Sequence, residues 1–351
     1  MNETEIKTLD ILANEIGNTM SISTLTTKIK EIHGNADYKN IHNSIQKFVE
    51  KNIVQLKKNG NSSIPKLNFG NYLLVDHLVQ NEIIKRIKFL EKNKNYQIIF
   101  LELILDLKNL KQLKTILLFN LDENIEKNKI ELLFILNGNE IKKETKQMEI
   151  IINRIKNKYN IEIEKILLEE NIFKSYLISQ ESNLFNEILK NKIIILNAES
   201  FWINIKELIT NGSIVKSEES TKINNISQVE CIYNLVKFSY TELANESIQS
   251  KEIGLEFLIT SILLKKEFYK YTNAIPVLLM KNKINFNYLI YLSLKYEVIN
   301  KLLGILKAMN KLTPTKQISK INKELSKQKV KSLEVNIEEI KLKMSFYNIL
   351  N

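Results

Sequence analysis

Few side chains in this sequence of 351 residues suit nucleophilic, acid–base or metal chemistry. The three histidines, His33, His42 and His77, all lie in the first 80 residues, so the rest of the chain has no imidazole for a Ser-His-Asp triad or for histidine general-base catalysis. Their spacing and neighbours are unlike a metal-binding cluster, and we expect no metal site. Cys231 is the only cysteine, which excludes an intramolecular disulfide and is consistent with a reducing cytoplasm. Because its neighbours are apolar, we expect Cys231 to be a core residue and not a nucleophile.

Amide and lysine side chains, which suit contacts with nucleic acid, follow one face of a helix predicted over residues 38–50. Asp37 precedes this helix, and Ile41, Ile45, Phe48 and Val49 form its inward stripe. The outward face carries Tyr38, Lys39, Asn40, His42, Asn43, Gln46 and Lys47. Asn and Gln side chains can hydrogen-bond adenine edges.

Residues 301–331 hold nine lysines against one acid, Glu324, and residues 225–351 carry +8 of the net charge of +11. A polyanion would be attracted to this basic segment. If the segment is helical, four of its lysines, spaced three or four residues apart, would share one face of the helix: Lys316, Lys320, Lys323 and Lys327. A solvated or protein-docked lysine face would give the same pattern, and both interpretations stay open. Arginine, the usual reader of guanine, occurs only as Arg86 and Arg154.

Composition predicts a helix-rich α+β protein, because 8 glycines and 3 prolines are too few for many tight turns. We expect four segments: residues 1–72, a helical connector over 73–111, an α/β domain over 112–210, and a helical domain over 225–351 after a polar linker. No apolar run reaches the ~18 residues of a membrane span, and the acidic start is unlike a secretory leader. We therefore expect no membrane contact and a cytoplasmic protein, with association with the nucleoid as an open alternative.

The hydrophobic pattern of the first 72 residues predicts three short helices followed by a β-hairpin. Ser23 is the expected cap of the second helix, with Leu25, Ile29 and Ile32 inward, and the hairpin strands are expected over 52–58 and 64–69. This order resembles a winged helix-turn-helix domain. The resemblance implies that the third helix enters the major groove of double-stranded DNA and that the hairpin touches its backbone. The implied contacts are Tyr38, Lys39, Asn40, Asn43, Gln46 and Lys47 on the helix, with Lys57, Lys58, Asn61 and Ser62 on the wing. Winged helices also bind proteins, so this alternative stays open.

Residues 73–111 are expected to form a helix whose buried positions include Ile83, Ile84, Ile87, Leu90, Ile98 and Leu101. Beyond them, short apolar strands are predicted over 115–119, 129–136, 161–167 and 193–196, with helices over 140–158, 184–190 and from 199 to 208. This order resembles the small nucleotidyltransferase domain of the DNA polymerase β superfamily, which prokaryotes, and archaea especially, often fuse behind a winged helix.

The catalytic signature of that family is degenerate here. An active member has Gly-Ser after the first strand and a pair of carboxylates, two residues apart, on the second, because backbone N–H groups and two metal ions must hold the triphosphate. These positions carry Asn120 and Leu121, then Lys129 and Glu131. Glu164 is a further surviving carboxylate. The resemblance therefore implies no catalytic residues and no cofactor. Three alternatives remain: a displaced active site using Asp122, Glu123, Glu126 or Glu131, a nucleotide whose phosphate meets Lys129, and a different kind of α/β domain.

The helical domain carries aromatic residues at helical spacing, which we interpret as core: Phe268, Tyr269, Tyr271, Phe286, Tyr288 and Tyr291. Taken together, the patterns predict a DNA-binding protein, a transcriptional regulator or chromosome-associated factor, with an inactive nucleotidyltransferase-like scaffold. A protein partner would bind that scaffold or the helical domain. The alternatives are an active nucleotidyltransferase that modifies protein or RNA, and an adaptor that binds RNA or protein.

Overall fold

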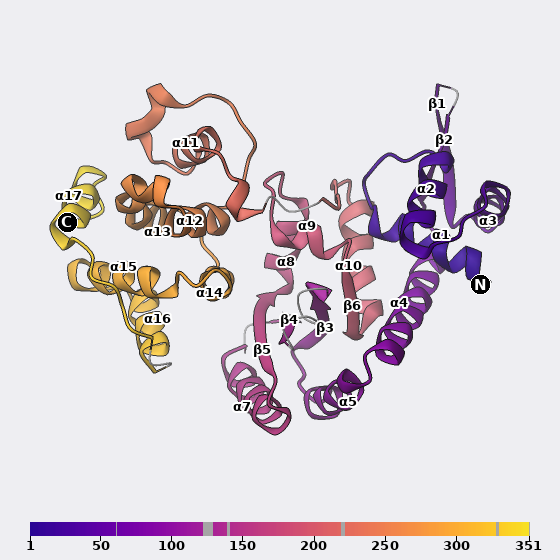
Figure 1. Ribbon diagram of the computed structural model, residues 1–351, viewed down its shortest axis with the longest axis horizontal. Helices are drawn as coiled ribbons and strands as arrows, with labels where there is room; N and C mark the ends of the chain where they lie inside the picture. The colour runs from indigo at the N-terminus through magenta and orange to yellow at the C-terminus, as the bar shows by residue number, and fades with distance from the viewer. Residues whose placement is uncertain (61, 122–128, 139–140, 219–221, 328–329, 351) are drawn as a thin grey trace. The chain divides into compact units, whose positions relative to one another are not determined.

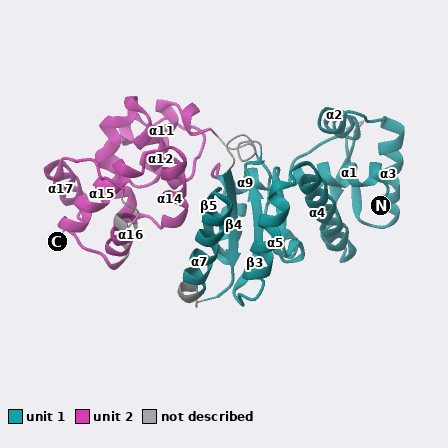
Figure 2. Cartoon of the chain, turned by 60° about the horizontal axis from the view of Figure 1, so that its bottom comes forward, with its two compact units in different colours: residues 1–179, 184–219 teal, residues 180–183, 220–351 magenta. Residues whose placement is uncertain are grey.

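The computed structural model describes residues 1–351 except 61, 122–128, 139–140, 219–221, 328–329 and 351 (Figure 1). Over the described residues the fold is α+β and rich in helix, as the composition predicts. The chain forms two compact units (Figure 2): unit 1 holds residues 1–179 and 184–219, and unit 2 holds residues 180–183 and 220–351. Both β-sheets of the described chain belong to unit 1.

Unit 1 begins with three helices, α1 (Glu3–Asn14), α2 (Ile22–His33) and α3 (Tyr38–Glu50). Each follows a capping side chain that accepts a backbone N–H of the first turn: Asn2, Ser21 and Asp37. The expectation that Ser23 caps α2 is wrong, because Ser21 precedes the helix and Ser23 lies inside its first turn. Ile32 is exposed and not inward, because it lies in the last turn of α2, beside the exposed residues 34–35.

A β-hairpin follows, as predicted. Strand β1 (Val54–Asn59) pairs antiparallel with β2 (Ser62–Leu67), from Val54 opposite Leu67 to Asn59 opposite Ser62. The second strand begins two residues earlier than the sequence suggested. The exposed side chains near its turn include Lys57 and Lys58.

Two helices form the connector, α4 (Leu73–Lys92) and α5 (Asn95–Leu107), where one was expected. The backbone leaves the helical region at Asn93, which has φ −122° and ψ 66°. Four apolar residues expected in the core are exposed instead: Ile83, Ile87, Ile98 and Leu101. For the two on α4, the reason is that the helix turns a polar face inward.

That inward face of α4 is built from buried or nearly buried polar side chains. Lys85 Nζ lies 3.1 Å from Asp10 Oδ1 on α1 and 3.9 Å from Glu82 Oε2. Asn81 Nδ2 donates a hydrogen bond to the same Asp10 oxygen at 3.2 Å. Because Asp10, Asn81 and Glu82 are all buried, these contacts compensate charges that water cannot reach.

The second sheet has four strands, in the order β5-β4-β3-β6: β3 (Leu113–Phe119), β4 (Lys129–Leu136), β5 (Glu162–Glu169) and β6 (Lys192–Leu196). β4 and β5 are parallel, and β3 is antiparallel to both of its neighbours. Hence β3 ends at the edge where the other three strands begin, which we call the Lys129 edge. At the opposite edge, the Lys114 edge, β3 begins and the other strands end.

Helices cover both faces of this sheet, which explains why β3 and β4 are apolar without alternation. On one face of the sheet, α5 and α7 (Ile141–Tyr159) share a core with strand residues such as Leu118 and Phe134. α8 (Glu170–Ile178) and α10 (Ala198–Thr210) contact β3, β4 and β5, and their buried Phe173 and Trp202 are not part of that core. The short α9 (Leu184–Ile188) precedes β6. Helix α8 is an element that the sequence pattern did not predict.

Unit 2 is helical over its described residues. Its α-helices are α11 (Gln228–Lys237), α12 (Leu255–Leu264), α13 (Ile275–Lys281), α14 (Phe286–Lys295), α15 (Ile299–Leu312), α16 (Lys316–Lys327) and α17 (Ile337–Phe346). Five of the six aromatic residues expected in the core are buried, whereas Tyr269 is exposed. Cys231 is fully buried, and burial raises the pKa of its thiol to about 12. A thiol in that state is not a nucleophile at neutral pH.

Candidate functional site

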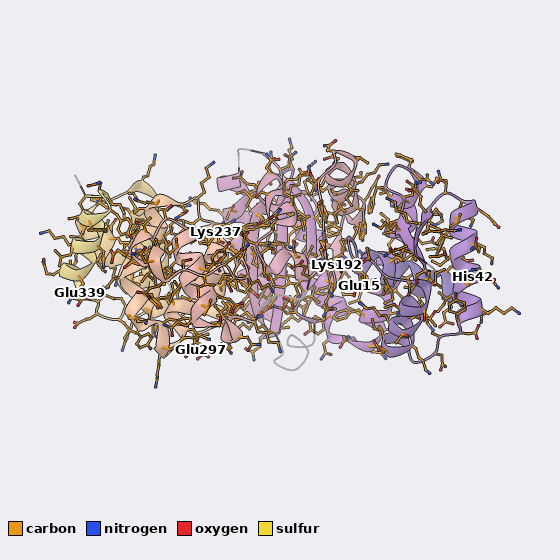
Figure 3. All side chains as sticks on the ribbon, turned by 90° about the horizontal axis from the view of Figure 1, so that it is seen from above. Glu15, His42, Lys192, Lys237, Glu297 and Glu339 are labelled. Atoms are coloured by element: carbon orange, nitrogen blue, oxygen red, sulfur yellow. The ribbon has the colours of Figure 1, made fainter. Side chains whose placement is uncertain are left out.

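The outer face of α3 is polar and open to solvent, because Ile41, Ile45 and Phe48 turn the other face into the core. Its exposed members are Tyr38, Lys39, Asn40, Asn43 and Lys47, with Gln46 half-buried beside them. We call these six residues the α3 face. His42, which is half-buried on the same helix, is labelled in Figure 3.

Three contacts order part of the α3 face. The Tyr38 ring stacks on His42 with 6.1 Å between ring centroids, and Gln46 Nε2 lies 3.5 Å from His42 Nε2. Lys47 Nζ lies 3.3 Å from Glu5 Oε1 of α1, so part of its charge is already neutralised. The amides of Asn40 and Asn43 are exposed and therefore accessible to base edges.

The hairpin adds a second exposed polar surface. Lys57, Lys58 and Ser62 are all exposed, whereas Asn61, expected at the same tip, lies outside the described residues. Lysines on such a tip suit contacts with phosphate oxygens, which position a protein on DNA without reading its sequence.

The positions of the degenerate signature meet at the Lys129 edge. Lys129 Nζ lies 2.9 Å from Glu131 Oε1 and 2.8 Å from Glu164 Oε2 on the neighbouring strand. Asn120 follows β3 in the left-handed region, with φ 53°, and its amide donates to Glu131 Oε2. The parallel pairing of β4 and β5 places Glu131 directly opposite Glu164, so both carboxylates reach the same ammonium group.

Burial and pairing act in opposite directions on this cluster. Burial lowers the pKa of Lys129, but hydrogen bonds to Glu164 and Glu131 outweigh burial, so the pKa is raised and the ammonium form is kept. Burial raises the pKa of Glu164, and the hydrogen bond with Lys129 offsets only part of this. The lysine thus neutralises carboxylates that would otherwise attract a cation.

Other signature positions contribute no acid to this cluster in the described chain. Leu121 is half-buried beside Asn120, and the alternative acids Asp122, Glu123 and Glu126 lie outside the described residues. Within the described chain, no group of three or more histidine, cysteine, aspartate or glutamate side chains is arranged to hold a metal ion.

Part of the basic segment, residues 316–327, forms α16 in unit 2. Ile318, Ile321 and Leu325 are buried in the core of that unit. Lys316, Lys320 and Lys323 lie on the exposed face, and Lys327 ends the helix with a side chain outside the described residues. The steps of three and four residues therefore place at least three ammonium groups on one solvated face.

Lys192 is a buried charge that the sequence analysis missed. It begins β6, its side chain is 0% exposed, and its Nζ lies 3.5 Å from Glu82 Oε1 and 3.0 Å from the Leu189 carbonyl oxygen. Lys192 is one of the residues labelled in Figure 3. Burial lowers the pKa of Lys192 to about 8. A lysine next to an apolar strand carries no sequence signal that separates a buried position from an exposed one.

Comparison with family models, curated proteins and solved structures found no match to this chain. Among the helices that the structure describes, none combines the length and apolar content of a membrane span. The α3 face, the Lys129 edge and α16 are therefore the structural features from which a function can be inferred.

Proposed function

We propose that this chain is a DNA-binding protein, a transcriptional regulator or chromosome-associated factor. In this proposal residues 1–72 act as a winged helix-turn-helix domain and the α3 face enters the major groove of double-stranded DNA. The main support for this proposal is that Asn40, Asn43 and Lys39 are exposed on one face of α3. The hairpin that follows α3 in the sequence also exposes two lysines, Lys57 and Lys58. Amide side chains suit hydrogen bonds to base edges, and lysines suit contacts with phosphates. The helix face would therefore read the DNA sequence, and the hairpin would position the protein on the DNA backbone.

The proposal assigns residues 112–210 to a nucleotidyltransferase-like scaffold without catalysis. It is supported by the Lys129 ammonium, which lies within 3 Å of both Glu131 and Glu164. Two-metal chemistry needs carboxylates that face a pair of divalent cations, and a fixed ammonium group there opposes their binding. The other support is that Asn120 hydrogen-bonds Glu131, which occupies the remaining acceptor oxygen of that carboxylate.

The test of DNA binding is selection from random-sequence duplexes with the full chain, followed by fluorescence anisotropy on the recovered sequences. We expect enrichment of a short motif and tighter binding to it than to a scrambled duplex of equal length. Recovery of no motif, together with equal affinity for all duplexes, would contradict sequence reading by α3.

A separate assay tests the inactive scaffold. Incubation of the chain with labelled nucleoside triphosphates and Mg²⁺ or Mn²⁺ is expected to label neither the protein nor added RNA. Glu131→Ala serves as the control, because background labelling does not depend on that carboxylate. Incorporation that disappears in Glu131→Ala would show an active nucleotidyltransferase and overturn this part of the proposal.

A further inference from the structure

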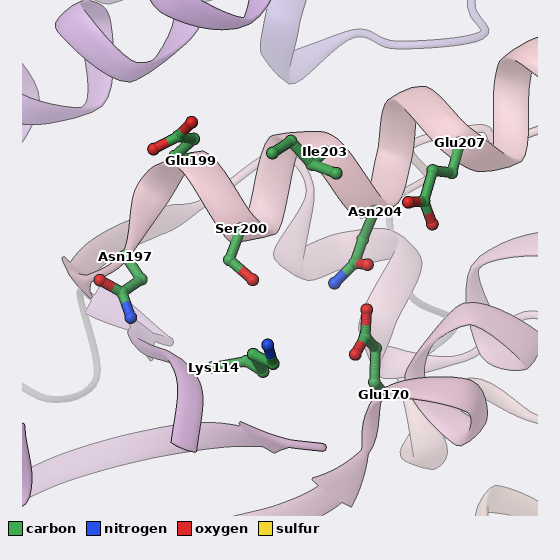
Figure 4. Close-up of a pocket in the computed structure, with 8 residues that line it drawn as sticks. All are labelled: Lys114, Glu170, Asn197, Glu199, Ser200, Ile203, Asn204 and Glu207. Carbon is green, nitrogen blue, oxygen red and sulfur yellow. The ribbon is translucent and has the colours of Figure 1, made fainter. Parts of the chain in front are cut away.

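A pocket of about 380 Å³ opens in unit 1 at the Lys114 edge of the sheet, opposite the Lys129 edge (Figure 4). Its walls come from the start of β3, the start of α8 and one face of α10. Pockets that hold small molecules are roughly 300–1,000 Å³, so this one suits a ligand of modest size. No residue of the pocket belongs to the α3 face or to α16.

Asn204 provides the first sign of a ligand. The side chain is 2% exposed, and its Nδ2 has no hydrogen-bond partner within the described chain. Figure 4 shows this amide nitrogen directed into the pocket. A buried N–H group without an acceptor is unfavourable, and a bound acceptor would remove that penalty.

Lys114 and Ser200 add two more donors. Both point into the pocket in Figure 4, and neither forms a hydrogen bond or ion pair with the described residues. The first turn of α10 lies beside them, and its N-cap, Asn197, makes no capping hydrogen bond through its side chain. Glu199 of the same turn also lines the pocket, but its carboxylate points away from Lys114 and Ser200 in Figure 4. The Lys114 ammonium and the Ser200 hydroxyl beside the first turn of α10, with the Asn204 amide one turn further along the helix, together favour an oxyanion such as a carboxylate.

Carboxylates on the other side restrict that ligand further. Glu170 and Glu207 line the pocket and share one counter-ion, Lys174, whose Nζ is 3.3 Å from Glu170 and 2.7 Å from Glu207. One negative charge of this pair is therefore left over. A simple anion would meet this excess charge, whereas a ligand with its own cationic group would be attracted to it.

We propose that this pocket binds a small zwitterion of the size of an α-amino acid. Its carboxylate accepts from Lys114, Ser200 and Asn204, and its ammonium group donates to Glu170 and Glu207. Binding here is independent of DNA binding, since neither the ligand nor the residues are shared with that function.

Isothermal titration calorimetry of the full chain with each of the twenty standard amino acids tests the proposal. We expect at least one to bind, and we expect its amide and its α-hydroxy analogue to bind about ten- to a hundredfold more weakly, because each lacks one charged contact. Absence of binding by every amino acid at millimolar concentration would overturn the proposal. Binding of inorganic phosphate or of the hydroxy acid as tightly as the amino acid would also overturn it, in favour of a simple anion site.

Variants locate the binding. Lys114→Gln is expected to weaken affinity about ten- to a hundredfold, and Asn204→Asp, which keeps the shape and replaces the donor with an acceptor, at least as much. Lys108→Gln, an exposed lysine at the end of α5, is the matched control and should bind as the parent does. If Asn204→Asp lowers the melting temperature, Asn204→Leu replaces it in the test, because leucine removes the unpartnered amide without adding a charge. Unchanged affinity in a folded Lys114→Gln or Asn204 variant would place the ligand elsewhere and overturn the proposal.

Discussion

Lys192 and Glu82 form an ion pair that solvent does not reach, with Nζ 3.5 Å from Oε1 and side chains 0% and 1% exposed. The same ammonium lies 5.0 Å from the centre of the Trp202 ring. Because Lys192 begins β6 and Glu82 lies in α4, the pair ties the four-stranded sheet to the helix that also contacts Asp10 of α1. A buried charge that loses its partner is strongly unfavourable, whereas loss of both charges is tolerated better.

Glu82→Gln should therefore lower the free energy of unfolding by about 3–5 kcal/mol, measured by urea denaturation near neutral pH. Adding Lys192→Met should recover part of this loss, since no unpaired ammonium then remains in the interior. Glu91→Gln, on the exposed side of α4, is the control and should change little. A double variant no more stable than Glu82→Gln would show that the pair is not the source of the effect.

Stability should depend on pH through Lys192. Its pKa is lowered from 10.5 to about 8 by burial, so between these values the unfolded chain binds more protons than the folded chain. The free energy of unfolding should then rise with pH from about 8 towards 10, by up to about 3 kcal/mol from this group. Lys85, whose pKa is raised by Glu82 and Asp10 against burial, does not lose its proton in this window. Denaturation curves of the parent and of Lys192→Met across the window provide the measurement, and parallel curves would argue against the assignment.

Lys129→Ala should leave the carboxylates of Glu131 and Glu164 facing each other without a cation. We expect a loss of about 3 kcal/mol at neutral pH that shrinks as the pH falls, because one protonated carboxylate ends the repulsion. Glu164 should take that proton, since burial already raises its pKa. Mg²⁺ should raise the melting temperature of this variant and not of the parent, with the exposed Lys156→Ala as control. If the variant responds to neither pH nor Mg²⁺ differently from the parent, Lys129 does not act as a built-in counter-ion.

Replacing Asn40, Asn43 and Gln46 together by Ala should reduce discrimination between the selected motif and a scrambled duplex. A good bidentate amide–base contact contributes ~1–3 kcal/mol of discrimination. Lys57→Ala with Lys58→Ala should instead weaken binding to both duplexes alike, because phosphate contacts carry no sequence information. Anisotropy titrations of the three proteins separate the effects, and a triple variant that discriminates like the parent would remove the α3 face from base reading.

Changing Lys316, Lys320, Lys323 and Lys327 to Glu should flatten the dependence of DNA affinity on salt. Each phosphate contact contributes ~0.9 to the slope of log affinity against log salt, so three lost contacts should be plainly visible. Sequence preference should not change. Titrations over several salt concentrations decide the matter: an unaltered slope would mean that the exposed face of α16 is solvated or serves another purpose.

Hydrophobic periodicity was enough to predict most helices and strands, including α3, the hairpin and the strands of the sheet. It failed where tertiary contacts decide the outcome. Apolar positions of α4 and α5, such as Ile83 and Leu101, were assigned to the core but are exposed. A hydrophobic pattern identifies an apolar stripe on a helix, but it does not show which other elements pack against that stripe. The order of the strands, the pairing of Lys192 with Glu82 and the pocket shared by Lys114 and Asn204 involve residues far apart in the chain. Local pattern contains no information on such contacts. The residues Lys129, Glu131 and Glu164 were singled out only through the resemblance to the nucleotidyltransferase signature, and the ion pairs among them were not predicted.

The polar inward face of α4 also determines which part of the chain can be transplanted. Asp10 belongs to the first 72 residues, but the cation that compensates it is Lys85, and Asn81 supplies a further donor. A fragment cut after residue 72 would keep the buried carboxylate and lose both partners. Extending the fragment through Lys92 would keep both partners of Asp10 but would separate the buried Glu82 from Lys192 on β6. The first three helices and the hairpin are therefore tied through α4 to the four-stranded sheet, and a fusion that grafts them onto another protein should carry that sheet with them.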